Sequence, residues 1–161
     1  MQINVSLKEL IGRFNAVTPM MLVGVQAVIE QTSERIRQTA AQKFGTYQPQ
    51  VGQFEAWPAL AADTLIKKYA AGAPDDDPLV GYYANNGGNK IWGQKLKDSL
   101  EVDIQPLLGI IYSDDPIALW QEYGVPEHNL PPRPFLMPAG YQEEDRFRKE
   151  IIAVVAATFR G

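Results

Sequence analysis

The sequence predicts an α+β domain in which a small antiparallel β-sheet packs against a long N-terminal helix and a C-terminal helix. Apolar residues recur at helical spacing near each end of the chain and indicate the two helices. Between them, residues 101–105 (EVDIQ) and 107–113 (LLGIIYS) have the composition of short strands, and Pro106 joins them in a tight turn. Two helices that flank such a sheet are typical of the α+β class.

The long N-terminal helix is expected to begin at Pro19 and to end at Phe44. Thr18 is expected to cap its start and Gly45 to stop it, and a shorter separate helix is expected over 7–15. We interpret the apolar row of the long helix as core packing. Its members are Leu22, Val25, Ile29, Ile36, Ala40 and Phe44, with Thr32 in the same row.

The middle of the chain predicts short elements separated by turns. Residues 59–71 and 93–100 each predict a short helix. Residues 72–90 (GAPDDDPLVGYYANNGGNK) are dense in Gly, Pro, Asp and Asn and predict a long loop. Loops of that length in compact domains are usually functional or mobile.

The last third of the chain predicts one more short element, a stiff arm and a final helix. Residues 117–124 (IALWQEYG) predict an extended segment or a short helix, and 143–161 predict a helix. The proline-rich arm spans 125–140, and its core LPPRPFLMPAG places four prolines around Phe135 and Leu136. Proline fixes its own φ and pushes the preceding residue toward extended conformations. The arm is therefore expected to be extended and not to lie inside a helix.

Length and composition indicate a single globular domain over residues 1–161. Hydrophobic residues make up 45% of the chain, and there is no cysteine, which excludes disulfides and thiolate chemistry. The net charge of −4 argues against strong sequence-independent binding to nucleic acid. The N-terminal MQINVSLKEL has no signal-peptide pattern and no apolar run is long enough to span a bilayer, so the chain is expected to stay in the cytoplasm where it is made.

The sequence shows no motif that would carry catalysis, a cofactor or a metal. His128 is the only histidine, and we interpret it as a solvated turn residue. GNKIWGQK (88–95) resembles a phosphate-binding loop only superficially, since Gln94 stands where the lysine belongs and no strand is expected before it. The acidic run 75–77 lacks the alternate spacing of a calcium loop, and Asp114 and Asp115 are turn formers. No catalytic, cofactor-binding or metal-binding residue and no cofactor is therefore expected.

Three segments in order carry a family resemblance: 54–69 (FEAWPALAADTLIKKY), 93–104 (GQKLKDSLEVDI) and 114–140 (DDPIALWQEYGVPEHNLPPRPFLMPAG). Together they resemble the tailed-bacteriophage virion morphogenesis proteins, the tail-completion and head-tail joining family. The matched positions are Trp57, Leu60, Thr64 and Lys67 or Lys68; Gly93, Leu96 and Ser99; Trp120 to Gly124; and Pro131 to Leu136. Glu122-Tyr123-Gly124 stands where members often carry His or Glu followed by Phe-Gly.

The resemblance implies a structural virion protein and not an enzyme. It implies a homo-oligomeric ring, a hexamer being favoured over a dodecamer, at the head-tail junction (neck) of a tailed bacteriophage, where it completes the tail or joins it to the head connector. Its partners would be other neck, connector and tail proteins, and double-stranded DNA would pass through the lumen without sequence-specific binding. The alternative is a small α+β enzyme or toxin-like protein whose site leaves no trace in the sequence.

The same resemblance assigns the interface or arm anchors. They are Arg133, Phe135, Leu136, Trp120, Tyr123 and Trp57. Phe135 and Leu136 would either fill a pocket on a neighbouring subunit or close the domain's own core, and both roles remain open. Arg133 would offer its planar guanidinium to a carboxylate of the same or a neighbouring subunit.

Overall fold

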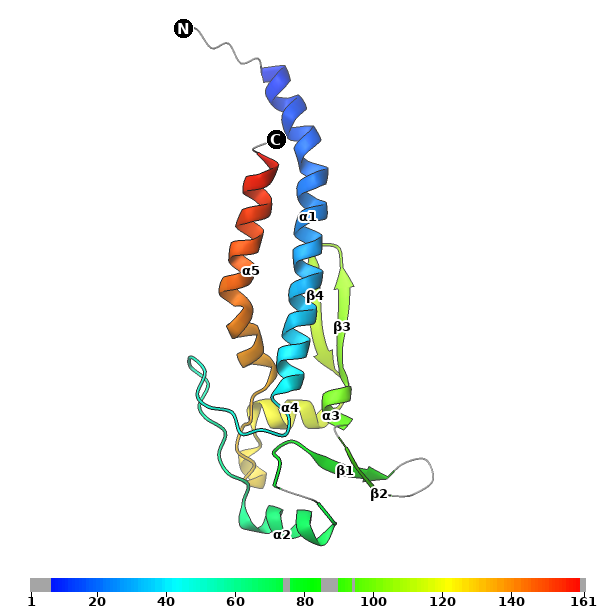
Figure 1. Cartoon of the computed structure of the whole chain (residues 1–161), viewed down its shortest axis with the longest axis vertical. Coiled ribbons are helices and arrows are strands. Elements are labelled where there is room, and N and C mark those ends of the chain that lie inside the picture. Colours follow the sequence, from blue (N-terminus) through cyan, green and yellow to red (C-terminus); the bar gives the residue numbers. More distant parts are fainter. Residues whose placement is uncertain (1–6, 74–75, 85–89, 94, 160–161) are drawn as a thin grey trace.

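The fold is an elongated pair of helices with a β-hairpin along one of them (Figure 1). The computed structural model describes residues 7–73, 76–84, 90–93 and 95–159. The long helices are α1 (Leu7–Gln42) and α5 (Leu136–Thr158), which pack along each other, and the hairpin of β3 (Leu100–Gln105) and β4 (Leu108–Ser113) lies against α1. The predicted α+β class, with a small antiparallel sheet and two long terminal helices, is confirmed.

The short elements gather at the end of the molecule away from both termini (Figure 1). They are α2 (Ala62–Ala70), β1 (Gly81–Ala84), β2 (Lys90–Gly93), α3 (Lys95–Asp98), α4 (Pro116–Tyr123) and a 3-10 turn at Pro126–His128. The helices expected near 59–71 and 93–100 are present as α2 and α3. The segment after the hairpin is the helix α4, with Asp115 capping it by accepting a 2.9 Å hydrogen bond from the N–H of Ile117.

The N-terminal helix is longer than predicted, because α1 runs without interruption through Pro19. The expected separate helix over 7–15 and the expected cap at Thr18 are therefore wrong. A proline inside a helix removes one backbone hydrogen bond and costs about 3 kcal/mol, but its fixed φ is itself helical, so a well-supported helix can continue across it. The end of the helix agrees with the prediction, since Gly45 has φ +84° just beyond it.

The segment 72–90 is not one long loop, because it contains β1 and the first residue of β2. These strands pair antiparallel with Gly81 opposite Gly93 and Ala84 opposite Lys90. The aromatic and β-branched residues of GYYA and KIWG favour strands, and the Gly- and Asn-rich residues between them masked that signal. Residues 74–75 and 85–89 of the predicted loop lie outside the described part of the chain, as does Asp75 of the acidic run.

Only residues 131–134 of the proline arm are extended, because Pro126–His128 form a 3-10 turn before them and Leu136 already begins α5. The expectation that LMPAG lies outside a helix is therefore wrong. Pro138 is the third residue of α5, within the first turn, where backbone N–H groups have no acceptor in the helix and a proline loses nothing. The predicted C-terminal helix is thus confirmed but begins earlier than residue 143.

The main core lies where α1, the arm and the short elements meet. Its buried members are Ala40, Ala41, Phe44, Trp57, Leu96, Leu100, Phe135 and Ala139. The predicted apolar row of α1 is buried toward this end, at Ala40 and Phe44, whereas Leu22 near the other end is 41% exposed. The two long helices therefore extend as a stem beyond the main core.

The hairpin is fixed on α1 by a glutamine and by a glycine. Gln26 accepts a 2.8 Å hydrogen bond from the backbone N–H of Leu107, which lies in the turn with φ 58°, and donates one of 3.4 Å to the carbonyl of Gln105. Gly109 of β4 passes so close to α1 that a Cβ atom there would lie 1.9 Å from Oγ of Ser33. Only glycine allows the strand and the helix to approach this closely.

Candidate functional site

The proline arm closes the core of its own chain. Phe135 is only 1% exposed and meets Phe44 edge to face, with ring centroids 5.0 Å apart. The buried indole of Trp57 donates a 3.0 Å hydrogen bond from Nε1 to the carbonyl of Pro134, and Leu136 packs against the same core. Of the two roles that the sequence leaves open for Phe135 and Leu136, their placement favours the domain's own core.

Arg133 is buried, and of the two carboxylate partners expected for it, one in the same subunit or one in a neighbour, the described residues supply none from its own subunit. Its side chain is 4% exposed, and Nη2 donates to the carbonyls of Pro58 at 3.2 Å and Ala59 at 3.3 Å. Within the described residues no carboxylate forms an ion pair with it, and its Nε is buried without a hydrogen-bond partner. Burial lowers the pKa of Arg133, a shift that the nearby Tyr47 hydroxyl opposes.

Glu122 organises the junction between α4 and α5, although the sequence did not single it out as a site residue. This buried side chain accepts hydrogen bonds from the backbone N–H groups of Phe135 (2.9 Å), Leu136 (3.0 Å) and Met137 (2.8 Å). These N–H groups lie at the start of α5, where they have no hydrogen-bond acceptor within the helix. A carboxylate there also suits the positive end of the helix dipole.

The other two predicted anchors point away from this core. Trp120 is 50% exposed and Tyr123 is 62% exposed, and Leu119 beside them is 61% exposed. They lie on one side of α4, because residues three and four positions apart on a helix are neighbours. We call Leu119, Trp120 and Tyr123 the α4 face. It is a contiguous apolar and aromatic surface of the kind that forms interfaces.

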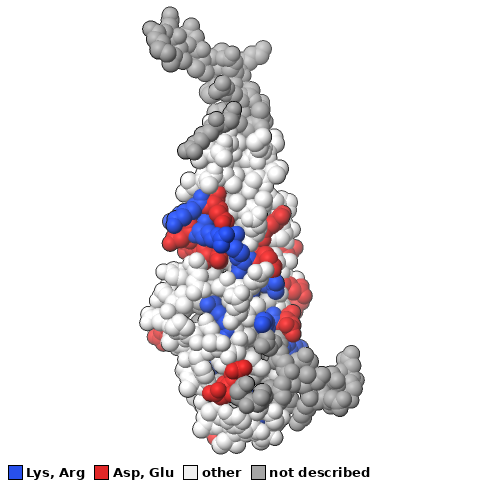
Figure 2. Space-filling model, in the orientation of Figure 1, with Lys and Arg blue, Asp and Glu red and all other residues white. Residues whose placement is uncertain are grey.

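A second apolar surface lies near the opposite end of the molecule, on the stem. No charged residue occurs between Arg13 and Glu30 of α1 or between Glu150 and Arg160. Figure 2 shows uncharged atoms on this part of the stem, above a dense group of charged side chains. The exposed members, which we call the stem end, are Met20, Leu22, Val23, Ile152 and Phe159.

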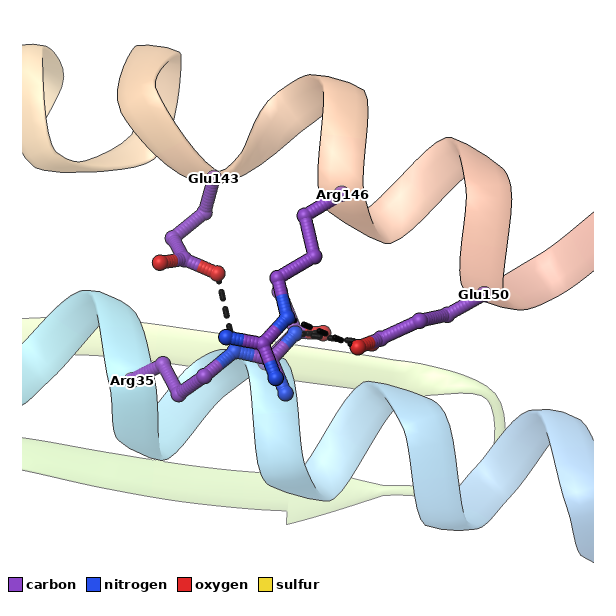
Figure 3. Close-up of polar contacts among 5 residues, drawn as sticks. Arg35, Glu143, Arg146 and Glu150 are labelled. Carbon is purple, nitrogen blue, oxygen red and sulfur yellow. Dashed lines mark hydrogen bonds and ion pairs between the residues drawn. The ribbon is translucent and has the colours of Figure 1, made fainter.

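The charged group below the stem end fastens α1 to α5 (Figure 3). Arg35 of α1 reaches Glu143 and Glu150 of α5, each at 2.8 Å, and Arg146 donates a further 2.8 Å hydrogen bond to Glu150. The hydrogen bonds from Arg146 and Arg35 lower the pKa of Glu150. This cluster therefore sets the register of the two helices, and its charges are paired within the chain.

An open pocket of about 1020 Å³ lies between α2, α4 and the arm, with Arg133 in its wall. We call it the basic pocket, because four of its lining residues are basic and two are acidic: Lys67, Lys68, Lys95 and Arg133, with Asp77 and Asp115. Lys68 donates to the backbone carbonyl of Asp77, and Lys95 lies 3.9 Å from the carboxylate of Asp115. The rest of the lining is largely apolar and includes Leu60, Leu79, Ile117 and Leu130.

The described residues contain no cluster of side chains that could hold a metal ion. His128 is exposed at the end of the 3-10 turn, and no group of three or more His, Asp or Glu side chains in the described chain could hold a metal ion. The expectation that no strand precedes the stretch 88–95 is wrong, because β1 (Gly81–Ala84) precedes it. Within the stretch, Lys90–Gly93 forms β2 and Lys95 begins the single turn of α3. Among the described helices, none has the length and hydropathy needed to cross a bilayer.

Comparison of the chain with protein-family models, with curated proteins and with solved structures gives no match. The sequence identified the arm, Trp57 and Arg133, which the structure brings together, and it identified Trp120 and Tyr123, which lie on a separate surface. It missed Glu122 and the basic pocket, since both depend on residues that are distant in sequence.

Proposed function

We propose that this chain is a non-enzymatic structural protein of a tailed-bacteriophage virion. In this proposal it forms a homo-oligomeric ring at the head-tail junction, hexameric in preference to dodecameric. The ring completes the tail or joins it to the head connector, and it contacts other neck and tail proteins. The chain is made in the host cytoplasm and acts in the virion.

One observation carries the proposal: the segments that resemble the head-tail joining family meet in a single junction of the fold. Trp57 from the first segment bonds to Pro134 of the third, and Arg133 bonds back to the carbonyl of Pro58. Leu96 from the second segment lies in the same core cluster as Trp57 and Phe135. The three segments thus form one continuous part of the fold, as is expected if they belong to one family signature, and this supports the resemblance.

The placement of the exposed apolar surfaces supports an assembling protein. The α4 face and the stem end lie toward opposite ends of an elongated molecule (Figure 1). Two different surfaces on one chain favour head-to-tail contacts, which close into a ring when the rotation between subunits allows it. Exposed aromatic residues such as Trp120 and Tyr123 are typical of the central residues of such interfaces.

The charge of the chain is compatible with a ring that surrounds DNA. A net charge of −4 per subunit provides no overall attraction to phosphate. DNA that passes through such a ring would not be held tightly, as a conduit requires. The proposal therefore includes no sequence-specific contact with DNA.

The test is the solution mass of the purified full chain over a range of concentrations, combined with electron microscopy. We expect a closed ring with a central opening, formed by the protein alone or on the ends of tails isolated from a phage that lacks it. Bovine serum albumin, an acidic protein that forms no ring, serves as the control for non-specific attachment to tails. A chain that remains monomeric at every concentration and leaves tail ends bare would contradict the proposal.

A further inference from the structure

The basic pocket contains the positive charge of Arg133, and no carboxylate of the described residues pairs with it. Arg133 stays protonated in proteins, and burial of a charge is costly unless the charge is paired. The carbonyls of Pro58 and Ala59 satisfy part of the guanidinium, but Nε has no partner and no described carboxylate pairs with it. An anion bound in the pocket would therefore neutralise the buried charge of Arg133.

The same wall contains an unmet hydrogen-bond acceptor. Oε1 of Gln121 is buried without a partner, and Gln121 lines the pocket together with Arg133. A buried polar atom without a partner costs free energy, so such atoms mark places where another group belongs. A ligand that satisfies both side chains must accept from a guanidinium and donate to an amide oxygen.

The remaining lining narrows the chemistry of that ligand. Lys67 and Lys95 add positive charge, so the sign of the pocket is opposite to the net charge of −4 on the whole chain. Apolar side chains such as Leu60 and Ile117 complete the walls. An acidic peptide segment fits this combination, because it supplies a carboxylate, backbone N–H donors and apolar side chains. The volume of about 1020 Å³ is sufficient for several residues.

We propose that the basic pocket binds the carboxylate of an acidic polypeptide segment from a partner protein. Arg133 and the two lysines Lys67 and Lys95 receive the carboxylate, and Gln121 accepts a hydrogen bond from the N–H of the bound segment. The proposal does not depend on the virion function, because the charge and the unpaired atoms of the pocket are properties of this chain alone.

The direct test is titration of the full chain with N-acetylaspartate, which carries carboxylates and an N–H. Binding is measured by calorimetry and by the change in melting temperature. The neutral diamide of N-acetylaspartate serves as the control ligand at matched ionic strength. We expect the charged ligand to bind and to raise the melting temperature, and the diamide to do neither. Equal effects of both ligands, or no effect of either, would overturn the proposal; a pocket that holds only water gives the second result.

Variants locate the binding. Lys67→Gln combined with Lys95→Gln removes two exposed charges without disturbing the core, and we expect it to weaken binding by about tenfold or more. Lys149→Gln, an exposed lysine of α5 outside the pocket, should leave binding unchanged. Equal affinity in the double variant and the control variant would place the ligand elsewhere and refute the assignment.

A mass measurement then identifies the source of the segment. If a second copy of this chain supplies it, saturating N-acetylaspartate or the double lysine variant should dissociate any oligomer that forms. If another protein supplies it, the ligand should bind without changing the mass. Both results support a carboxylate site, and they also separate it from the ring proposal, since a monomer that binds the ligand would keep the site and contradict the ring.

Discussion

The carboxylate of Glu122 in α4 accepts a 2.9 Å hydrogen bond from the backbone N–H of Phe135 and so fixes the start of α5 against α4. The helix has no cap from its own sequence, because Phe135 occupies the N-cap position without a side-chain hydrogen bond. Glu122 also accepts from Leu136 and Met137. A residue of one helix therefore replaces the local cap of another, and the orientation of α5 depends on that of α4.

The first prediction tests this cap. Glu122→Gln keeps the size of the side chain but removes the charge and one acceptor, so it should lower the free energy of unfolding by about 2 kcal/mol, the scale of a hydrogen bond to a charged group. For a chain of this length the melting temperature should fall by about 4–8 °C. The control is Glu127→Gln, an exposed acid in the following turn, which should stay within about 0.5 kcal/mol. Equal melting of the two variants would show that the cap contributes nothing.

The second prediction concerns the central residue of the core. Phe135→Ala should cost about 3–5 kcal/mol, because it removes a fully buried ring and leaves a cavity. His128→Ala, on an exposed turn, should change stability by less than about 0.5 kcal/mol. Thermal melts of the two variants check this. A Phe135→Ala protein that melts normally but fails to assemble would instead assign Phe135 to an interface.

The elements that the sequence predicted well are those with a repeating local signal. The apolar row of α1 follows the helical period, and the hairpin of β3 and β4 follows from β-forming residues on either side of Pro106. The errors in the predicted helix bounds come from prolines. Pro19 predicts the start of a helix and Pro138 predicts an extended arm, whereas Pro19 lies inside α1 and Pro138 in the first turn of α5.

The site was predicted only where the residue itself is unusual. A proline-bracketed Arg133 and the tryptophan Trp57 attract attention as single residues, but the hydrogen bonds of Arg133 to Ala59 and of Trp57 to Pro134 span 74 and 77 positions of the chain. Glu122 gives no local signal, since its partners are backbone groups 13–15 residues away. Which atoms remain unpaired in the basic pocket depends on the packing of α4 against the arm, and no periodicity in the sequence reports that.

The third prediction contrasts two glycines. Gly109→Ala should destabilise the fold, because the new Cβ would lie 1.9 Å from Oγ of Ser33 and 3.2 Å from Cγ2 of Ile29; overpacking of this kind typically costs about 1–3 kcal/mol. Gly140→Ala should stabilise it by up to about 1 kcal/mol, since a Cβ in α5 there meets nothing within 4 Å and alanine is the better helix former. Denaturant unfolding measures both changes. A Gly109→Ala variant as stable as the wild type would contradict the close approach of β4 to α1, and a destabilised Gly140→Ala variant would contradict the open space at Gly140.

The fourth prediction concerns the ion pairs of Arg35 and Arg146 with Glu150, which we call the clamp between α1 and α5: their contribution to stability should depend on pH. The pKa of Glu150 is lowered by Arg146 and Arg35, so the unfolded chain binds a proton more readily than the folded one. The stabilisation is therefore present above the ordinary carboxyl value of 4.5 and is lost as the pH falls below it. Glu150→Gln should be less stable than the wild type at neutral pH, and the difference should shrink in acid.

The matched control for the clamp is Glu144→Gln, which breaks a 2.7 Å pair with Arg148 inside α5 and leaves the contact between the helices intact. Exposed pairs of this type contribute little, so its melting temperature should stay close to that of the wild type. Melting curves of the three proteins between neutral and acidic pH test the prediction. A Glu150→Gln deficit that is constant over this range would exclude the carboxylate as its source.

The fifth prediction separates assembly from folding. Trp120→Ala and Tyr123→Ala remove half-exposed rings of the α4 face, so the melting temperature of the single chain should change little, whereas the proposed ring should be lost. Aromatic residues central to an interface typically contribute about 2 kcal/mol or more each, which corresponds to roughly thirtyfold weaker association per contact. Tyr69→Ala in α2 is the matched control, because Tyr69 is a 53% exposed aromatic outside the α4 face, and it should assemble normally. Solution mass against concentration for the three variants gives the answer. Variants of the α4 face that form the same oligomer as the control would show that the ring, if it forms, uses another surface, and the stem end would then be the next to test.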